Sequence, residues 1–147
     1  MFKKILFPTD GSENSKRALD YALEIAKKFN SEVVILHTYE FISLFYGHPT
    51  AAIGVNHYSN EIRKDLIEYG EKILNSTKNI FEAENIKVEV LHENGDAGSL
   101  IVKALKDKEC DVVVIGSRGM GSVESFLLGS VSNYVIHHTN KPVLLID

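Results

Sequence analysis

A glycine-rich stretch and the start of a later helix are the residues of this chain best suited to hold an anion. Three glycines lie within six residues in the stretch Gly116-Ser117-Arg118-Gly119-Met120-Gly121-Ser122, which follows a short apolar run. Glycine permits positive φ and close backbone approach, so successive N–H groups can converge on an anion. Further on, Gly129 and Ser130 stand where a helix is predicted to begin, and a helix N-terminus is a ready phosphate site. The pattern predicts a two-part phosphate cradle; the alternative is a glycine-rich turn that only connects a strand to a helix.

This candidate cradle holds little positive charge. Between Ile115 and Tyr134 the only basic residue is Arg118, and Glu124 offsets it. The chain also lacks the P-loop pattern G-x-x-x-x-G-K-[ST], and no G-x-G-x-x-G follows its first predicted strand. A phosphate bound here would therefore rely on backbone amides and hydroxyls, with a metal ion as a further partner.

Short apolar runs separated by helical periods predict the elements that position these residues. The alternation of strands and helices predicts an α/β fold with a parallel sheet and right-handed crossovers. Helix N-caps are expected at Ser12 and Asp96, and Asn140 is expected to end the last helix in the left-handed region. The predicted strands are Ile5 to Phe7, Val33 to Leu36, Ile86 to Leu91, Val112 to Ile115 and Val143 to Ile146.

Ligands of an open α/β sheet lie beyond the carboxyl ends of the strands, so the residues after each strand are candidates. Pro8-Thr9-Asp10 follows the first strand and His37-Thr38 follows the second. Asp10 either binds a ligand or metal, or forms the turn before Gly11. His37 is expected to be a packed, hydrogen-bonded residue rather than a base.

The connection from residue 40 to residue 57 is long and apolar for a loop. It contains Phe41, Ile42, Leu44, Phe45 and Tyr46. Three interpretations stay open: a short extra helix packed on the core, a lid over a ligand, or a dimer contact.

Length and composition are those of one globular domain spanning residues 1–147. Hydrophobic residues make up 44% and charged residues 24% of the 147 residues. The net charge of −4 is not that of a general nucleic-acid binder. Cys110 is the single cysteine, the first residues hold too short an apolar run for a signal peptide, and no window approaches the length of a membrane span. We therefore expect a cytoplasmic protein that binds neither nucleic acid nor membrane.

The glycine pattern resembles that of the ATP-binding members of the universal stress protein family. Gly116-x2-Gly119-x9-Gly129-Ser130 matches their signature G-x2-G-x9-G-[ST]. The opening Lys4 to Ser12, His37 after the second strand, and the segment Lys141 to Ile146 are similar to the corresponding parts of the family. The similarity covers the whole chain, with the connection 40–57 as its least typical part.

The resemblance implies an open five-stranded parallel sheet of order 3-2-1-4-5 with helices on both faces, a Rossmann-like fold of the adenine nucleotide alpha hydrolase-like kind. It also implies a homodimer. In that strand order the last strand, Val143 to Ile146, lies at an apolar sheet edge, which invites pairing with a second chain.

Carried over residue by residue, the resemblance implies that ATP is bound, with Mg or Mn beside it. Asp10 would lie near the ribose or hold the metal, and Thr38 would offer backbone groups to the adenine. The other residues would flank the nucleotide, wrap its ribose and phosphates, or close on the phosphate chain: Pro8, Thr9, Gly116, Ser117, Arg118, Gly119, Met120, Gly121, Ser122, Gly129, Ser130, Val131 and Ser132.

The expected function is a nucleotide-dependent regulatory or stress-response switch that acts through partner proteins. The alternative is a slow or partner-activated ATPase. Hydrolysis needs an oriented water and charge stabilisation at the γ-phosphate. Because Arg118 is the one arginine near the loop and no acidic residue is clearly placed as a base, efficient intrinsic hydrolysis is not expected.

Overall fold

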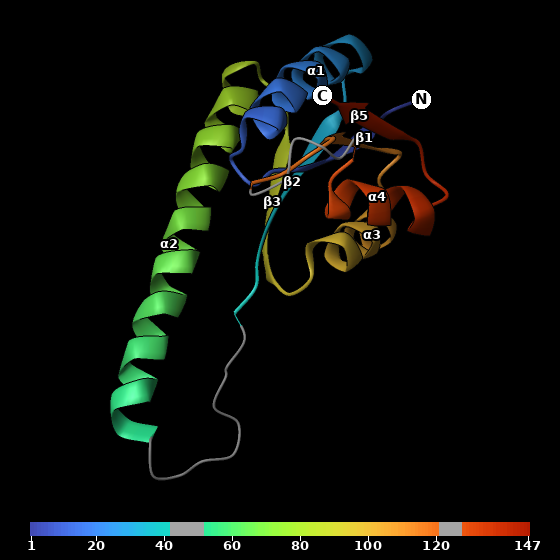
Figure 1. The fold of residues 1–147 in the computed structure, drawn as a ribbon. Coiled ribbons are helices and arrows are strands. Elements are labelled where there is room, and N and C mark those ends of the chain that lie inside the picture. The colour runs from blue at the N-terminus through green and yellow to red at the C-terminus, as the bar shows by residue number, and fades with distance from the viewer. Residues whose placement is uncertain (42–51, 121–127) are drawn as a thin grey trace.

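The computed structural model of the chain describes residues 1–41, 52–120 and 128–147. Within these residues, parallel strands form a five-stranded sheet of order β3-β2-β1-β4-β5 (Figure 1). The predicted fold class and strand order are therefore confirmed. In chain order the elements are β1 (Lys4–Pro8), α1 (Glu13–Phe29), β2 (Glu32–Tyr39), α2 (Ala52–Ala83), β3 (Val88–Asn94), α3 (Ala97–Asp107), β4 (Val112–Gly116), α4 (Ser130–His138) and β5 (Val143–Ile146).

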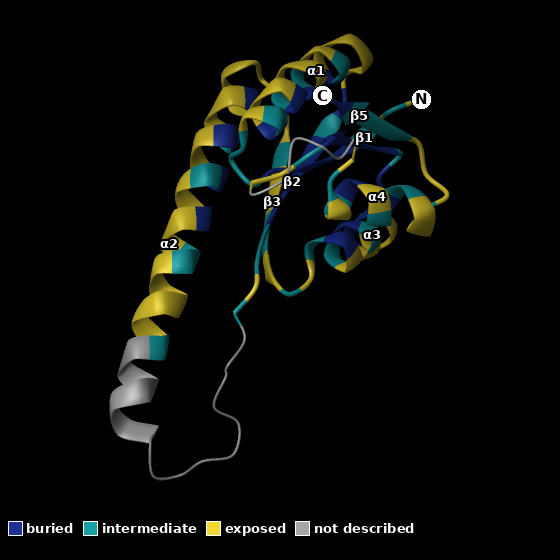
Figure 2. Ribbon diagram, viewed as in Figure 1, coloured by how far each residue is buried: buried dark blue, intermediate teal, exposed yellow. Residues whose placement is uncertain are grey.

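The sheet separates two hydrophobic cores, one on each face. Ile5 and Phe7 of β1 face α1 and α2, where the ring of Phe81 meets that of Phe7 edge-on at 6.0 Å. Leu6 faces the other way, toward Ile101 of α3 and the buried face of α4. The central strands are therefore covered on both sides, which is why they read as unbroken apolar runs (Figure 2).

The loops at the carboxyl ends of the strands are fixed by helix caps. The Ser12 side chain accepts a hydrogen bond from the Ser15 N–H at the start of α1. The Asp96 carboxylate does the same for the Ser99 N–H at the start of α3. Both predicted N-caps are confirmed, and each holds the chain where it leaves the sheet.

Three expectations about element ends need correction. α2 begins at Ala52, inside the predicted connection, and residues 42–51 lie outside the described ones, so the three interpretations of that segment stay open. β3 extends from Val88 to Asn94 because it pairs with β2 as far as Tyr39. Asn140 does not end α4 in the left-handed region. Thr139 leaves the helix in an extended conformation, and its hydroxyl accepts from the N–H of Lys141.

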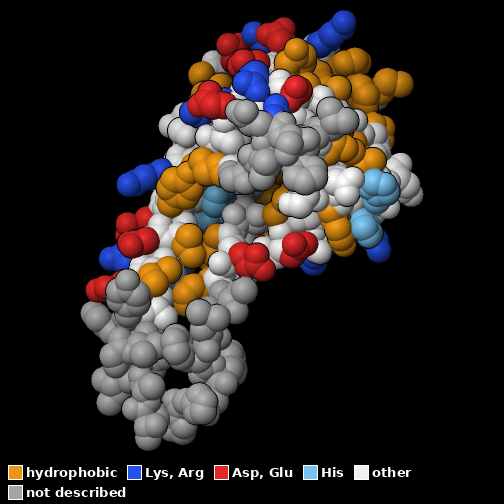
Figure 3. Space-filling view, in the orientation of Figure 1, with side chains coloured by type: hydrophobic (Ala, Val, Ile, Leu, Met, Phe, Trp, Pro, Cys, Tyr) orange, Lys and Arg blue, Asp and Glu red, His pale blue; other side chains and the backbone are white. Residues whose placement is uncertain are grey.

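No described helix is long and apolar enough to cross a membrane. On the described part of the face seen in Figure 3, Lys and Arg side chains are interspersed with Asp and Glu rather than gathered in one basic patch.

Candidate functional site

A cavity of about 180 Å³ lies at the carboxyl ends of β1, β2 and β4, next to the starts of α3 and α4. This is the point where the strand order reverses, which is where open α/β sheets bind ligands. The cavity brings together most of the sequence-predicted residues: Pro8, Thr9, Asp10, Thr38, Gly116, Arg118, Gly119, Met120, Gly129, Ser130, Val131 and Ser132. Gly121 and Ser122 lie outside the described residues.

Ser117 does not line the cavity but lies beneath it and joins its walls. Its N–H donates to Ile146 O at 2.7 Å, so the end of β4 is tied to the end of β5. Its carbonyl oxygen accepts from Gly129 N–H at 2.7 Å and from the Ser132 hydroxyl at 2.6 Å. Its own hydroxyl accepts from the Asn14 side-chain amide of α1 at 3.3 Å. Ser117 therefore supports the cavity wall through its hydrogen bonds, and the ligand contact expected for it stays a prediction.

The glycines of the signature lie where a side chain would be crowded. A Cβ on Gly116 would lie 3.0 Å from the backbone of Asn14, and one on Gly129 would lie 3.2 Å from Arg118 Cα. A Cβ on Gly119 would lie 2.6 Å from Asp10 Oδ2. None of these three glycines adopts positive φ, so close backbone approach, not the left-handed conformation, explains them.

Asp10 links the loop after β1 to the loop after β4. Its Oδ1 accepts from Ser12 N–H at 2.9 Å, which is a turn within the first loop. Its Oδ2 accepts from Met120 N–H at 3.0 Å. Burial alone would raise the pKa of this carboxyl, but the hydrogen bonds from Ser12 and Met120 outweigh it and the pKa is lowered. Asp10 is thus a charged side chain at the cavity wall, as well as a turn former.

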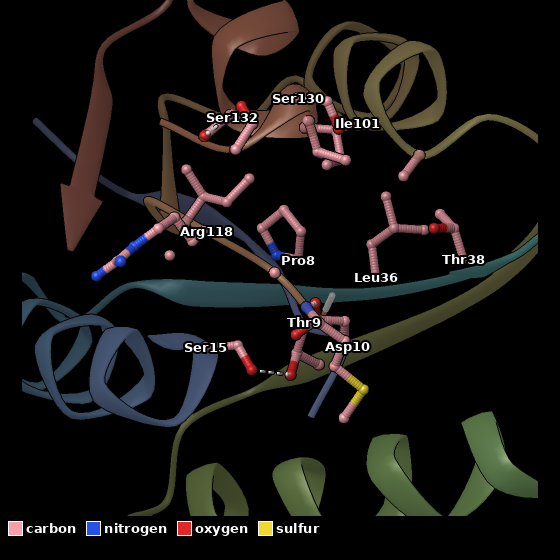
Figure 4. Close-up of a pocket in the computed structure, with 17 residues that line it drawn as sticks. Pro8, Thr9, Asp10, Ser15, Leu36, Thr38, Ile101, Arg118, Ser130 and Ser132 are labelled. Carbon is pink, nitrogen blue, oxygen red and sulfur yellow. Dashed lines mark hydrogen bonds between the residues drawn. The ribbon is translucent and has the colours of Figure 1, made fainter. Parts of the chain in front are cut away.

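Arg118 contributes to the cavity wall but its charged end is engaged elsewhere. Its guanidinium donates to Asp147 Oδ1 at 2.7 Å. Figure 4 shows the guanidinium turned away from Pro8, Thr38 and Ile101, which line the cavity. Among the described lining residues it is the only Lys or Arg, so the cavity itself carries little positive charge.

The remaining wall is partly apolar and was missed by the motif analysis. The residues concerned are Ser15, Leu36, Ala97, Ile101 and Ile115. Leu36 and Ile115 lie near the carboxyl ends of strands, and Ala97 and Ile101 lie in the first turns of α3 just after the Asp96 cap. That placement, just after strand ends and a helix cap, is the signal from which these residues could have been found.

The described residues hold no cluster of three or more His, Cys, Asp or Glu that could bind a metal ion by itself. A metal near Asp10 would therefore need oxygen ligands from a bound molecule or from water, as Mg²⁺ ordinarily takes.

An open parallel sheet with a cavity at its switch point is the arrangement of Rossmann-like α/β proteins. Comparison with known proteins gives a narrower assignment, because the model of the universal stress protein family matches residues 1–147. The chain belongs to the universal stress protein family.

Relatives match over nearly the whole length of the chain. Universal stress protein YxiE of Bacillus subtilis is 33% identical over 147 residues, covering 99% of both chains. The solved structure of Methanocaldococcus jannaschii MJ0577 superposes with a TM-score of 0.81 at 32% identity and covers 99% of this chain and 96% of that one. The Archaeoglobus fulgidus universal stress protein in complex with dAMP has a TM-score of 0.70 at 20% identity, covers 100% of this chain and 98% of that one, and shares the fold.

The Asp10 carboxylate is expected to stabilise the fold through its two backbone hydrogen bonds. Asp10→Asn should lower the free energy of unfolding by about 1 kcal/mol at neutral pH, because hydrogen bonds to a charged group are among the stronger ones and this group is only partly buried. The contribution is present above the unfolded pKa of 3.8 and is lost as the pH falls through the lower folded pKa. Urea unfolding across acidic pH should therefore converge for wild type and variant. Asp20→Asn, on the exposed side of α1, is the control, and parallel wild-type and Asp10→Asn curves would contradict the assignment.

Proposed function

We propose that the protein binds ATP in the cavity at the switch point and acts as a nucleotide-dependent regulatory switch in the stress response. The observation that carries the proposal is the composition of this one cavity. One side is apolar, with Leu36 and Ile101, and the other consists of the glycine loop and the start of α4. A flat apolar base and a phosphate chain need these two kinds of wall.

The apolar side suits the adenine. Leu36 and Thr38 come from the end of β2, and Ile101 comes from α3 opposite them. Thr38 would offer backbone groups to the edge of the base, and the aliphatic side chains would cover its faces. The dAMP complex of the Archaeoglobus fulgidus relative supports an adenine nucleotide as the ligand class.

The polar side suits the phosphates. The first hydrogen bond within α4 runs from Asn133 N–H to Gly129 O. The N–H groups of Ser130, Val131 and Ser132 come before it and are therefore not used by the hydrogen bonds of the helix itself. These residues line the cavity together with Gly119. The cradle would thus bind phosphate oxygens through amides and the Ser130 hydroxyl. Asp10 would share a Mg or Mn ion with them; Gly121 and Ser122 belong to the same proposal but lie outside the described residues.

Gly119→Val tests the phosphate cradle. A branched side chain here would meet Asp10, since a Cβ alone would lie 2.6 Å from Oδ2, and would block backbone approach to the phosphates. ATP binding should weaken at least tenfold, about 1.4 kcal/mol, in isothermal titration calorimetry. Ala83→Val adds a similar side chain at an exposed position at the end of α2 and should leave the affinity unchanged. Equal ATP affinity in wild type and Gly119→Val would overturn the site.

We propose that binding, not turnover, is the function of the site. The one arginine among the described lining residues is held by Asp147, and an arginine at the γ-phosphate is worth about 10³–10⁵ in rate. ATP incubated with the purified protein should therefore release phosphate more slowly than about 1 s⁻¹, the low end for typical enzymes. Faster phosphate release without a partner, abolished by Arg118→Ala at unchanged ATP affinity, would favour the ATPase alternative.

We further propose that the protein forms a homodimer through β5. This strand is an edge of the sheet, and its residues Val143, Leu144 and Leu145 are only half-buried. The opposite edge, β3, carries Glu89 and Glu93 among its exposed residues. Charged residues protect an edge from pairing, whereas an apolar edge favours it.

Matched substitutions at the two edges test the dimer. Light scattering of the wild type should give about twice 16.4 kDa. Val143→Lys on β5 should reduce the mass to that of one chain, because a lysine at the pairing edge cannot be buried without a partner. Val90→Lys makes the same change on β3 and should leave the dimer intact. A wild-type monomer at every concentration would remove the proposal.

We place this function in the cytoplasm. The single cysteine can form no intramolecular disulfide. It is buried, and desolvation raises the pKa of the Cys110 thiol to about 11, so it stays protonated and unreactive.

A further inference from the structure

Two histidines face each other under α2, where neither the fold nor the proposed ligand explains them. His37 of β2 and His92 of β3 are partners in the strand register, and their ring centroids lie 5.2 Å apart. Nδ1 of His37 and Nε2 of His92 are fully buried, and neither has a hydrogen-bond partner among the described residues. His37 is packed, as the sequence predicted, but this nitrogen is not hydrogen-bonded. Buried polar atoms are normally paired, so two unpaired ones at one place need a reason.

Both nitrogens converge on the same point of α2. A Cβ on Gly70 would lie 2.4 Å from His92 Nε2 and 2.6 Å from His37 Nδ1. Gly70 lies inside a long helix, where glycine is about 1 kcal/mol less favourable than alanine. The missing side chain is what lets the two rings pack beneath the helix. The three residues form one contact, which we call the histidine latch.

The latch can close this way only while Nδ1 of His37 carries no extra proton. A proton there would place a buried charge against the Gly70 backbone and the His92 ring. Burial first, and the His92 charge second, lower the pKa of His37, while the Asp10 carboxylate acts in the opposite direction. Those two are the charged groups that act on His37 among the described residues. The other titratable neighbours contribute aromatic rings, Tyr69 of α2 beside His37 and Tyr39 of β2 beside His92.

The same stretch of α2 contacts both loops of the candidate site. The Tyr69 hydroxyl donates to Met120 Sδ at 3.6 Å. One turn further on, Ile73 packs on Gly11, where a Cβ would lie 3.0 Å from Ile73 Cδ1. Met120 and Gly11 belong to the two loops that Asp10 ties together. A displacement of α2 at the latch would therefore also disturb the contacts that hold the two loops of the cavity.

We propose that the histidine latch is a pH-sensitive device: with His37 neutral it holds α2 against β2 and β3, and uptake of a proton by His37 in mild acid releases this part of α2 and loosens the two cavity loops. The first half concerns the fold alone. The second half rests on the proposed nucleotide binding at the cavity.

Proton linkage determines whether a fall in pH favours the open or the closed latch. In the opened or unfolded chain His37 titrates at its ordinary value of 6.5, whereas in the closed latch its pKa is lower. The open state therefore binds more protons than the closed state once the pH falls below that value. Above the ordinary pKa of 6.5 the contribution of His37 to closure is fully present. This contribution is progressively lost as the pH falls toward the lower pKa of the closed state. Between about pH 7.5 and about pH 5.5, one histidine that titrates lower in the closed state raises the opening constant by at most about tenfold.

Hydrogen exchange and NMR on the full chain test the latch without a nucleotide. Protection factors of α2 amides near Gly70 should fall by up to about tenfold between these two pH values, while those of the central strand β1 fall less. His37→Gln keeps a polar side chain but cannot titrate, so it should flatten this pH dependence. His137→Gln, at an exposed position on α4, should keep it.

Nitrogen-15 shifts of the wild-type imidazoles keep the proposal testable if His37→Gln does not fold. A titration of His37 at or above its ordinary value would overturn the latch.

A rescue pair tests the geometry of the contact. Gly70→Ala should destabilise the protein although alanine is the better helix former, because its Cβ would overlap both rings. Adding His92→Ala to Gly70→Ala should recover part of the loss. A Gly70→Ala variant as stable as the wild type would show that the rings do not require the glycine.

ATP titrations at the same two pH values test the link to the cavity. Affinity should drop several-fold in mild acid for the wild type and His137→Gln, and less for His37→Gln. Absence of ATP binding at both pH values would overturn the proposed function, while the exchange data would still decide on the latch. Unchanged affinity with a pH-dependent α2 would overturn the coupling alone.

Discussion

The geometry of the cavity depends on the hydrogen bonds of one residue, Ser117, at the point where β4 ends. Its N–H, carbonyl oxygen and hydroxyl are all engaged, with the end of β5, the start of α4 and the start of α1. Elements far apart in the sequence therefore meet at a single peptide. Because buried polar groups are costly to leave unpaired, the chain has little freedom to move any of these elements separately. The glycines agree with this constraint, since a Cβ at Gly116 or Gly129 would be crowded against the backbone that Ser117 draws close.

The sequence was sufficient for the fold because the relevant signals are local. Continuous runs of apolar residues, many of them β-branched, indicate strands that are covered on both faces. Ser12 and Asp96 mark the starts of helices, because each accepts a hydrogen bond from the N–H three residues further on. The glycine spacing likewise predicted which two segments would meet. The structural role of Ser117 was not foreseen because its partners come from residues 14, 129, 132, 146 and 147. Nothing in the local pattern distinguishes a serine that contacts a ligand from one that supports the wall behind it.

The histidine latch shows a second kind of signal that sequence analysis passed over. His37 was judged from its own strand, but its unpaired nitrogen becomes meaningful only beside His92 and Gly70. A glycine deep in a long amphipathic helix has a cost, and that cost was the available indication that another side chain occupies the space. The length of α2 matters here as well. One straight element contacts the histidine pair through Gly70, the glycine loop through Tyr69 and the first loop through Ile73.

The charges around the cavity determine what a phosphate ligand would have to change. Asp10 already occupies the Met120 N–H with a carboxylate oxygen, and Arg118 is neutralised by Asp147. An anionic ligand therefore meets a wall that carries a negative charge and offers few cations. Where such a ligand comes close to Asp10, it must displace the carboxylate from the amide or share a divalent cation with it, because like charges at close range are unfavourable. Either event alters the Asp10–Met120 hydrogen bond, which is the link between the loops after β1 and β4. A ligand in the cavity would then change the position of Met120, a residue that is 59% exposed at the surface. It would also change the contact that α2 makes with Met120 through Tyr69.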